Sequence, residues 1–301
     1  MLQLFFGHLS VFPLKKLVIF GVGLIGGSVA LALKKQANAP LCVGVGRNQA
    51  NLDQALALHI IDEAATDLAT ALQDADMVLI AAPVAQTKSI LQSIQPHLNQ
   101  QTIITDAGST KTDIVAIAKE ILGAQANQFI GGHPIAGAER SGATAAMRDL
   151  YHGKNVVLTP TAENTVEQIN QVRQLWQSCG ANVIEMSAEK HDGIFATVSH
   201  LPHLLAFALV EDIASRDNAD ELFQFAASGF RDFTRIAGSS PEMWRDISFA
   251  NKTALLSEIT SYEQALSSLK QSLKNDDADA LEAAFQRASD ARNQWAKNKK
   301  L

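Results

Sequence analysis

The pattern of hydrophobic and polar positions changes near residue 186 of the chain. Before this point, short continuous apolar runs alternate with segments whose apolar residues recur at helical spacing. The runs that predict strands are, in chain order, LVIFGVG, LCVGVG, DMVLIAAP, TIITDAG, QFIGGHP, NVVLTP and ANVIEM. Runs without a polar face are typical of strands buried on both sides, as in a parallel sheet covered by helices. The pattern therefore predicts a doubly wound parallel α/β sheet.

After residue 187 the strand pattern stops and apolar residues recur at helical spacing over long segments. Ser240 and Pro241 are a cap and first-turn pair, which predicts that one helix begins there. Pro202 is expected to kink another helix. We therefore divide the chain into three parts: an N-terminal extension (1–16), a doubly wound α/β domain (17–186) and an all-helical domain (187–301).

Glycines after the first predicted strand indicate a nucleotide site. The segment LVIFGVGLIGGSVALAL combines a strand, the motif Gly21-x-Gly23-x-x-Gly26 and a helix. Gly21 permits a tight turn, Gly23 lets the backbone approach a pyrophosphate, and Gly26 permits close packing of helix on strand. Free N–H groups at a helix N-terminus attract phosphates, so Leu24 and Ile25 are candidate contacts too. A glycine-rich turn without a ligand is the alternative to this predicted dinucleotide site.

The end of the second predicted strand bears on the choice between NAD and NADP. NAD sites carry an acidic residue about 20 positions after the glycines, where it binds the ribose 2′-hydroxyl. This chain has Gly46 and Arg47 there, so a 2′-phosphate meets a cation and no carboxylate. We expect NADP to be preferred. NAD is the alternative if Arg47 is solvated or stacks on the adenine.

The segment GGHPIAGAE places His133 at the end of another predicted strand. Ligands of open α/β sheets bind at the carboxyl ends of the strands, and a neutral imidazole has its ordinary pKa near working pH. His133 is therefore a candidate general base for the oxidation of an alcohol. The alternative for such a histidine, taken alone, is one satisfied by local backbone hydrogen bonds.

Three further segments add polar residues. DAGSTK brings Ser109 to the same sheet edge, either as a donor to a ligand or as the cap of the next helix. SHLPH places His200 and His203 on one helical face, but no carboxylate or cysteine has a companion spacing, so no metal site is predicted. GFRDFTRIAGSSPEMWRDI holds arginines, which either bind a carboxylate or form a solvated, salt-bridged turn.

Taken in this order over nearly the whole chain, GVGLIGGS, DAGSTK, GGHPIAGAE, SHLPH and GFRDFTRIAGSSPEMWRDI resemble the prephenate and arogenate dehydrogenases of tyrosine biosynthesis. The resemblance implies a Rossmann domain followed by a helical dimerisation domain. It also implies oxidative decarboxylation of a cyclohexadienol to 4-hydroxyphenylpyruvate or tyrosine. By similarity, His133 deprotonates the ring hydroxyl, Ser109 orients that hydroxyl and the nicotinamide, and Arg235 holds the ring carboxylate. The other matched pocket positions are His200, His203, Glu139 and Trp244.

Composition is consistent with this interpretation. A chain of 301 residues with 47% hydrophobic residues is long enough for two ordinary domains. Its net charge of -6 and the lack of a basic patch argue against nucleic acid as a partner. No signal peptide or membrane-spanning run is predicted, and Cys42 and Cys179 have no metal or disulfide spacing, so we expect a cytoplasmic protein. Long helices with apolar stripes predict a homodimer.

Two other functions are compatible with these residues. A β-hydroxyacid dehydrogenase would use a lysine of the helical domain, for which Lys252 is the candidate. A non-catalytic sensor would bind the dinucleotide without turnover. Because the sequence ends at Leu301 after a predicted helix, we expect neither an ACT domain nor a fused chorismate mutase. Inhibition by tyrosine at the active site stays open, as does the choice between prephenate and arogenate.

Overall fold

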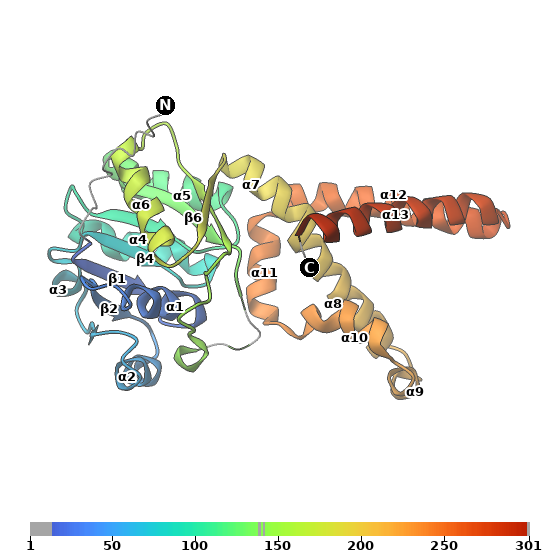
Figure 1. Ribbon diagram of the computed structural model, residues 1–301, viewed down its shortest axis with the longest axis horizontal. Helices are drawn as coiled ribbons and strands as arrows, with labels where there is room; N and C mark the ends of the chain where they lie inside the picture. Colours follow the sequence, from blue (N-terminus) through green and yellow to red (C-terminus); the bar gives the residue numbers. More distant parts are fainter. Residues whose placement is uncertain (1–13, 138–139, 141, 300–301) are drawn as a thin grey trace, which may run out of the picture. The chain divides into compact units, whose positions relative to one another are not determined.

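The computed structural model of the protein describes residues 14–137, 140 and 142–299 (Figure 1). Most of the predicted extension 1–16 lies outside the described residues. The chain forms two compact units, one up to Asn251 and one from Lys252. The predicted division at residues 186 and 187 stays a prediction.

The strands all belong to the first unit. They are β1 Lys16–Phe20, β2 Leu41–Val45, β3 Glu63–Ala64, β4 Met77–Ile80, β5 Ile103–Asp106, β6 Phe129–Pro134, β7 Asn155–Thr159 and β8 Asn182–Glu185.

All seven predicted strands are present in one sheet of the order β3-β2-β1-β4-β5-β6-β7-β8. The sheet also contains β3, a two-residue strand that the apolar pattern did not predict. The predicted parallel sheet is confirmed for all strand pairs but one, since β7 runs antiparallel to β6. A parallel neighbour needs a crossover connection, usually an α-helix, whereas the described residues between these two strands contain one 3-10 helix, Ala143–Ala145, and no α-helix. The chain therefore reverses direction there.

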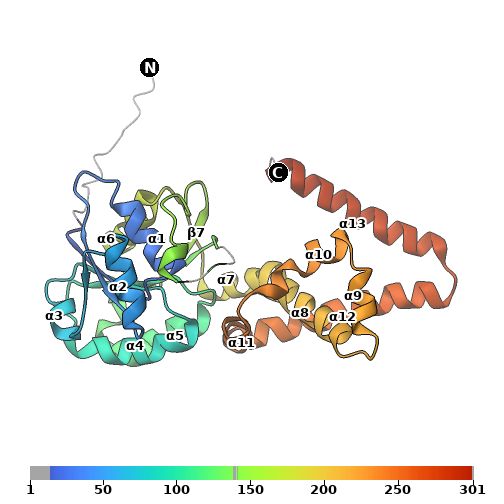
Figure 2. The same cartoon turned by 90° about the horizontal axis from the view of Figure 1, so that it is seen from below.

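Helices cover both faces of the sheet (Figures 1 and 2). Those of the first unit up to β8 are α1 Leu24–Leu33, α2 Gln49–Ala57, α3 Leu68–Leu72, α4 Thr87–Ile94, α5 Thr112–Leu122 and α6 Val166–Ser178. The apolar cluster on one face includes buried residues of α1, α2 and α6. The cluster on the other includes buried residues of α3, α4 and α5, which lie in a row in Figure 2. In β1, Leu17 and Ile19 belong to the first cluster and Val18 and Phe20 to the second. This arrangement confirms the doubly wound fold.

The part of the first unit after β8 is helical among the described residues. It contains α7 Ala188–Phe195, the π-helix η5 Ala196–His200, α8 Leu201–Ala214, α9 Ala219–Gln224, α10 Ser228–Thr234, the 3-10 helix η6 Arg235–Gly238 and α11 Pro241–Ala250. The start of α11 is as predicted, since the Ser240 hydroxyl accepts a hydrogen bond from the Met243 N–H at 3.3 Å and Pro241 is the first helical residue. Ile247 of α11 joins the core cluster that contains α4 and α5.

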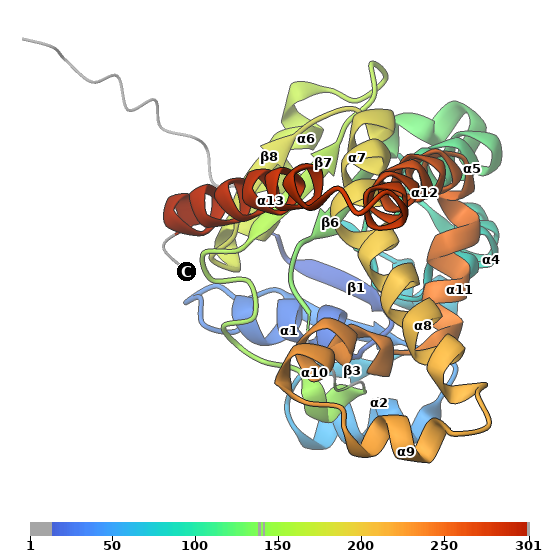
Figure 3. The same ribbon diagram turned by 90° about the vertical axis from the view of Figure 1, so that its right-hand side faces the viewer.

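The helices α7 and α8 form one helical run, interrupted by the π-helix (Figure 3). Pro202 has no N–H and therefore cannot donate a hydrogen bond to the carbonyl of the preceding helical turn. The π-helix occupies that preceding turn. By length and composition alone, the run Ala188–Ala214 is apolar enough to cross a membrane. It nevertheless carries buried His191, Asp192 and His200, which are costly side chains in a lipid environment.

The second unit is a helical hairpin of α12 Lys252–Lys274 and α13 Ala278–Lys299 (Figure 2). A short turn joins the helices, and the Asp277 carboxylate accepts a hydrogen bond from the Ala280 N–H at 2.9 Å, which caps α13. Both helices carry large exposed apolar side chains, namely Leu256, Tyr262, Leu266, Leu273, Phe285 and Trp295. The helical prediction for this segment is confirmed.

Candidate active site

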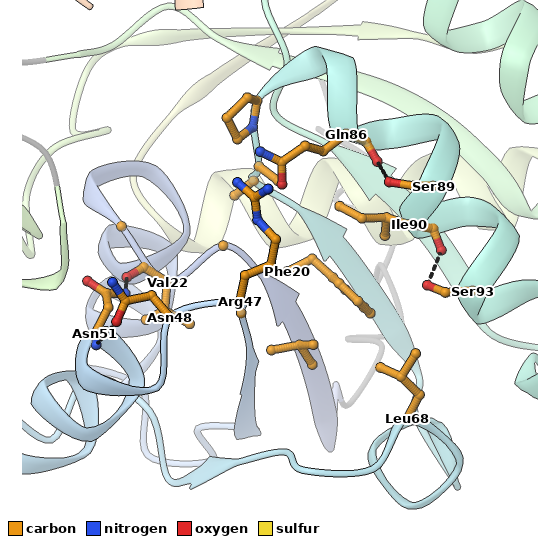
Figure 4. Close-up of a pocket in the computed structure, with 17 residues that line it drawn as sticks. Phe20, Val22, Arg47, Asn48, Asn51, Leu68, Gln86, Ser89, Ile90 and Ser93 are labelled. Atoms are coloured by element: carbon orange, nitrogen blue, oxygen red, sulfur yellow. Dashed lines mark hydrogen bonds between the residues drawn. The ribbon is translucent and has the colours of Figure 1, made fainter. Parts of the chain in front are cut away.

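A cavity of about 780 Å³ lies at the carboxyl ends of β1, β2 and β4 (Figure 4). The strand order reverses at β1, which has β2 on one side and β4 on the other. Dinucleotides bind at this position in Rossmann-type sheets. The glycine turn after β1, the end of β2 and the segment from Ala81 to Ser93 line the cavity.

The three motif glycines have different surroundings. Gly21 has φ +92°, and a Cβ there would lie 2.6 Å from the Ala81 carbonyl oxygen. A Cβ on Gly26 would collide with the carbonyl oxygen of Gly21. A Cβ on Gly23, by contrast, meets nothing closer than the Gly142 nitrogen at 4.0 Å. Gly21 and Gly26 are therefore required by the fold, whereas the space at Gly23 fits the approach of a pyrophosphate.

The N-terminus of α1 is open to an anion. Gly23 is its N-cap and supplies no side-chain cap, so Leu24 and Ile25 stand in the first turn where N–H groups lack intrahelical partners. The open position of Gly23 and these free donors together fit the phosphates of a dinucleotide. The residues predicted from the glycine motif thus come together at one end of the cavity.

Arg47 is exposed at the rim of this cavity, and its guanidinium extends toward Gln86 (Figure 4). Among the described residues that line the cavity, none is acidic. Sequence reasoning missed Asn51, whose side chain donates to the Val22 carbonyl at 2.7 Å and accepts from the Ala143 N–H at 3.0 Å. Asn51 therefore links the glycine turn to the loop after β6.

A second group of polar residues surrounds the predicted base. His133 is in β6, and its Nδ1 lies 2.7 Å from Nε2 of His191 in α7. Nδ1 of His191 lies 2.8 Å from Oδ1 of Asp192. The ring of Phe195 packs edge-on against the His133 ring, with centroids 4.8 Å apart. A strand of the sheet and the first helix after β8 thus contribute side chains to one site.

Burial keeps these histidines neutral. The pKa of His133 lies well below its usual value, mainly because the ring is buried. The nearby groups His191, Lys111 and His200 lower it further. Burial also lowers the pKa of His191, although Asp192 opposes this. Burial alone would raise the pKa of Asp192, but the hydrogen bonds that its carboxylate accepts lower it overall. The site therefore combines neutral imidazoles with an ionised carboxylate at neutral pH.

Asp192 also caps α5, which corrects one alternative for Ser109. The Asp192 carboxylate accepts hydrogen bonds from the N–H groups of Lys111 at 2.9 Å and Thr112 at 2.8 Å. The N-cap of α5 is Lys111, and no side chain of its own caps the helix. Ser109 is therefore not a helix cap. It is partly buried next to the histidines, since its backbone influences the pKa of His200.

A buried ion pair supports the strand that carries His133. Lys111 and Asp106 are both fully enclosed and contact each other through Nζ and Oδ2. Oδ1 of Asp106 accepts a hydrogen bond from the Gly132 N–H at 2.9 Å. A Cβ on Gly132 would lie 2.7 Å from the Asp106 carbonyl oxygen. The glycines before His133 therefore let β6 pack closely on the end of β5.

The neighbours of His200 determine which of its ring nitrogens carries the proton. The Asn251 amide donates to the Asp192 carbonyl at 2.8 Å and lies 3.1 Å from Nδ1 of His200, so this Nδ1 accepts and Nε2 carries the proton. Burial lowers the pKa of His200 to about 4, although a hydrogen bond with the Ser109 backbone opposes this. Within the described residues, the buried Nε1 of Trp244 has no hydrogen-bond partner. The indole N–H is therefore a buried donor without an acceptor in this part of the chain.

His203 and Trp244 confirm that the helical motifs meet. Their rings stack with centroids 3.6 Å apart, and the His200 ring lies 6.1 Å from the same indole. Arg235 is exposed in η6, close enough to lower the pKa of His203. The candidate Glu139 lies outside the described residues. Lys252 is the first residue of α12, in the second unit.

The sequence reasoning missed His191, Asp192 and Asn251. A signal was present for two of them, because KHDG sets a histidine and an aspartate side by side directly before the apolar run that begins at Ile194. Such a pair is unusual on a buried face. Asn251 follows α11 and carries no comparable signal.

Two family models match consecutive parts of the chain. The family model described as the nucleotide-binding domain of prephenate dehydrogenase matches residues 29–185. The model described as the prephenate dehydrogenase dimerization domain matches residues 187–287. The prephenate dehydrogenase of Bacillus subtilis is 37% identical over 92% of this chain and 75% of its own length. The cyclohexadienyl dehydrogenase of Zymomonas mobilis is 31% identical over 92% of this chain and 95% of its own length.

Solved structures agree with these matches. The structure of prephenate dehydrogenase from A. aeolicus with hydroxyphenyl propionate and NAD+ superposes with a TM-score of 0.87 at 36% identity, over 93% of this chain and 98% of that one. Synechocystis arogenate dehydrogenase superposes with a TM-score of 0.79 at 31% identity, over 93% of this chain and 100% of that one. Both matches cover more than nine tenths of this chain.

Proposed function

Because the chain belongs to the prephenate dehydrogenase family, we propose that it oxidises and decarboxylates prephenate, arogenate or both, with NAD or NADP as the hydride acceptor. This proposal rests on the neutral, half-buried His133, which a hydrogen bond to His191 holds at the sheet edge. The family match removes the support for a β-hydroxyacid dehydrogenase or a non-catalytic sensor. Relatives named for prephenate, cyclohexadienyl and arogenate activity all resemble the chain.

For this reaction the protein must position the substrate against the nicotinamide and remove one proton from the ring hydroxyl. When bound, the nicotinamide takes the hydride from the ring carbon that bears the hydroxyl. We assign to His133 the removal of the hydroxyl proton, because a neutral imidazole can accept it directly. The developing carbonyl withdraws electrons from the ring, the ring carboxylate leaves as carbon dioxide, and the ring becomes aromatic. Ser109 is the proposed donor that orients the hydroxyl.

The substrate's acidic groups need donors, and the helical part supplies them. We assign the ring carboxylate to Arg235, since a planar guanidinium can bind a carboxylate through two parallel hydrogen bonds. The unpartnered N–H of Trp244 is suited to an oxygen atom of the substrate's side chain, and the imidazole of His200 lies beside it. The stack on Trp244 holds His203 beside them. These assignments explain why two separate helical motifs meet at one place.

We propose NADP as the preferred cofactor. A cavity lining without an acidic residue does not repel a 2′-phosphate, and Arg47 offers a cation at its rim. The space at Gly23 and the open N-terminus of α1 fit the pyrophosphate that both cofactors share. The distinction between the two therefore rests on Arg47.

We also propose a homodimer. Large apolar side chains remain exposed in the helical part of the first unit, including Val198, Phe249 and Phe225, which follows α9. The hairpin of the second unit adds further exposed apolar residues. Exposed apolar surface on this scale is typical of an interface. A solution mass of two chains, measured by light scattering at micromolar concentration, is the expected result, and a mass of one chain would contradict it.

The function is tested by turnover of the purified protein. Prephenate and arogenate are each supplied with NAD and with NADP, and formation of the reduced nicotinamide and of carbon dioxide is followed. We expect both products in equal amounts with at least one substrate, and a higher kcat/KM with NADP. Reduction without carbon dioxide release, or no turnover in any of the four combinations, would refute the proposed reaction.

A further inference from the structure

Three side chains form a line of hydrogen bonds behind the predicted base. His133 Nδ1 lies 2.7 Å from His191 Nε2, and His191 Nδ1 lies 2.8 Å from Asp192 Oδ1. Two backbone N–H groups at the start of α5 hold the Asp192 carboxylate in place. His191 and Asp192 are almost completely buried. The line is therefore rigid at the end that lies away from His133.

The chemistry of these groups fixes where each proton lies. An ionised carboxylate only accepts hydrogen bonds, so Nδ1 of His191 must carry a proton toward Asp192. His191 is neutral because burial lowers its pKa, which leaves a lone pair on its Nε2. That lone pair accepts the proton carried by Nδ1 of His133. A neutral His133 with its proton on Nδ1 has its own lone pair on Nε2.

We propose that His191 and Asp192 are positioning residues that hold His133 in the tautomer with the proton on Nδ1, so that Nε2 is the nitrogen that receives the substrate's proton. This inference rests on the proposed role of His133 as the base. Packing assists the alignment, because the Phe195 ring lies 4.8 Å from the His133 ring and 4.4 Å from the His191 ring, centroid to centroid. Neither imidazole is free to turn.

The line also stabilises the charge that the reaction creates. As the hydroxyl O–H bond breaks, its proton bonds to Nε2 of His133 and the ring becomes an imidazolium. The Nδ1 proton then lies between two imidazole nitrogens, and the negative charge of Asp192 stands behind the second ring. No further reactant is needed, because the proton passes to solvent after the product leaves. His133 has a lowered pKa, so its protonated form is unfavourable in the resting site. The hydrogen bond to His191 and the charge of Asp192 stabilise that form when the substrate's proton is transferred.

Other charges around the line do not replace Asp192. Lys111 and His200 disfavour a positive charge on His133. Asp106 is paired with Lys111, and its other oxygen accepts from the Gly132 N–H. Asp192 is therefore the carboxylate that the imidazole line reaches directly.

A matched pair of substitutions at His191 tests the inference. His191→Leu keeps the bulk but removes the acceptor, so His133 can place its proton on Nε2. We expect kcat to fall at least roughly tenfold, because the variant loses part of the rate enhancement that a general base provides. The dissociation constant of the cofactor should be unchanged. His191→Gln offers an amide oxygen to Nδ1 of His133 and is expected to recover much of the lost kcat. Equal losses in both variants would contradict the inference.

Asp192→Asn and a spectroscopic measurement complete the test. Asparagine still caps a helix, so we expect a reduced kcat without loss of folding, whereas Asp277→Asn at the cap of α13 leaves kcat unchanged. Nitrogen NMR of histidine-labelled wild-type protein reads the tautomer of His133 in the resting state. A proton on Nε2 there, or an Asp192→Asn variant with wild-type kcat, overturns the inference even if His133→Asn is inactive. An active His133→Asn variant refutes the role of His133 as the base instead, and a wild-type protein without turnover refutes the proposed function.

Discussion

The imidazole of His203 stacks on the indole of Trp244 with ring centroids 3.6 Å apart and the planes inclined by 20°. This contact joins α8 to α11 and places the two rings beside buried His200. A stack of this kind restrains both side chains without using the N–H of the indole. It therefore leaves a polar group free for a ligand while it fixes the geometry around that group.

The buried histidines make stability depend on pH. Burial lowers the pKa of His200 from 6.5 to about 4, so as pH falls below 6.5 the unfolded chain binds a proton before the folded protein does. The free energy of unfolding is therefore unaffected by His200 above pH ~6.5 and decreases on acidification, by about 2 kcal/mol at pH ~5. His133 and His191 act in the same direction.

Urea unfolding at several pH values measures this dependence. His200→Gln is expected to flatten the fall between neutral pH and pH ~5, because one of the linked groups is gone. His152→Gln, at an exposed histidine, should leave the slope as in wild type. A wild-type midpoint that does not move with pH would contradict the neutral, buried state of the cluster.

Two glycines of one motif should respond differently to alanine. Gly23→Ala places its Cβ in open space, so the protein should fold normally and bind dinucleotide weakly. Gly26→Ala drives its Cβ into the Gly21 carbonyl oxygen, so the melting temperature should fall clearly. Melting curves and dinucleotide titrations of both variants provide the check. The opposite assignment of the two effects would show that Gly23 has a structural role.

His133→Asn should reduce kcat by roughly 10²- to 10⁴-fold, because an amide does not accept the proton that a general base removes. Cofactor affinity should be unchanged, since His133 does not line the cavity of the glycine turn. Steady-state kinetics and a separate cofactor titration distinguish the two quantities. More than half of the wild-type turnover in this variant would rule out His133 as the base.

Arg47→Ala should weaken NADP and spare NAD. A charge-assisted hydrogen bond contributes about 1.5 to 3 kcal/mol, so kcat/KM with NADP should fall roughly tenfold to a hundredfold. Salt should reduce the difference, because Arg47 is exposed. We compare kcat/KM for both cofactors at low and high ionic strength. A wild type that prefers NAD, or a variant that loses both cofactors equally, speaks against recognition of the phosphate by Arg47.

Arg235→Lys should act on substrate kinetics far more than on cofactor binding. Lysine replaces a planar fork by a point charge, so kcat/KM for the substrate should fall. Arg231→Lys is the matched control, since Arg231 is exposed on the preceding helix and lies 3.6 Å from the carboxylate of its neighbour Asp232. The same kinetics in both variants would mean that Arg235 does not hold the carboxylate.

Much of the fold follows from local pattern. Continuous apolar runs identified seven of the eight strands, because strands buried on both faces have no polar side. The glycine turn after β1 and the start of α11 were predictable for a similar reason. Gly21 needs a backbone conformation that other residues avoid, and Ser240 with Pro241 caps a helix through neighbouring atoms. Each of these features depends on residues close together in sequence.

The tertiary structure decided what distant segments do to one another. No local pattern reveals that β7 turns back antiparallel to β6, because a long connection allows either direction. The same holds for Asp192, which caps a helix that begins 80 residues earlier, and for His191, which meets His133 across 58 residues. Packing of α7 against the sheet brings these groups together. The sequence alone therefore determined the layers and the candidate base, and only folding determined the partners that hold the base and its proton.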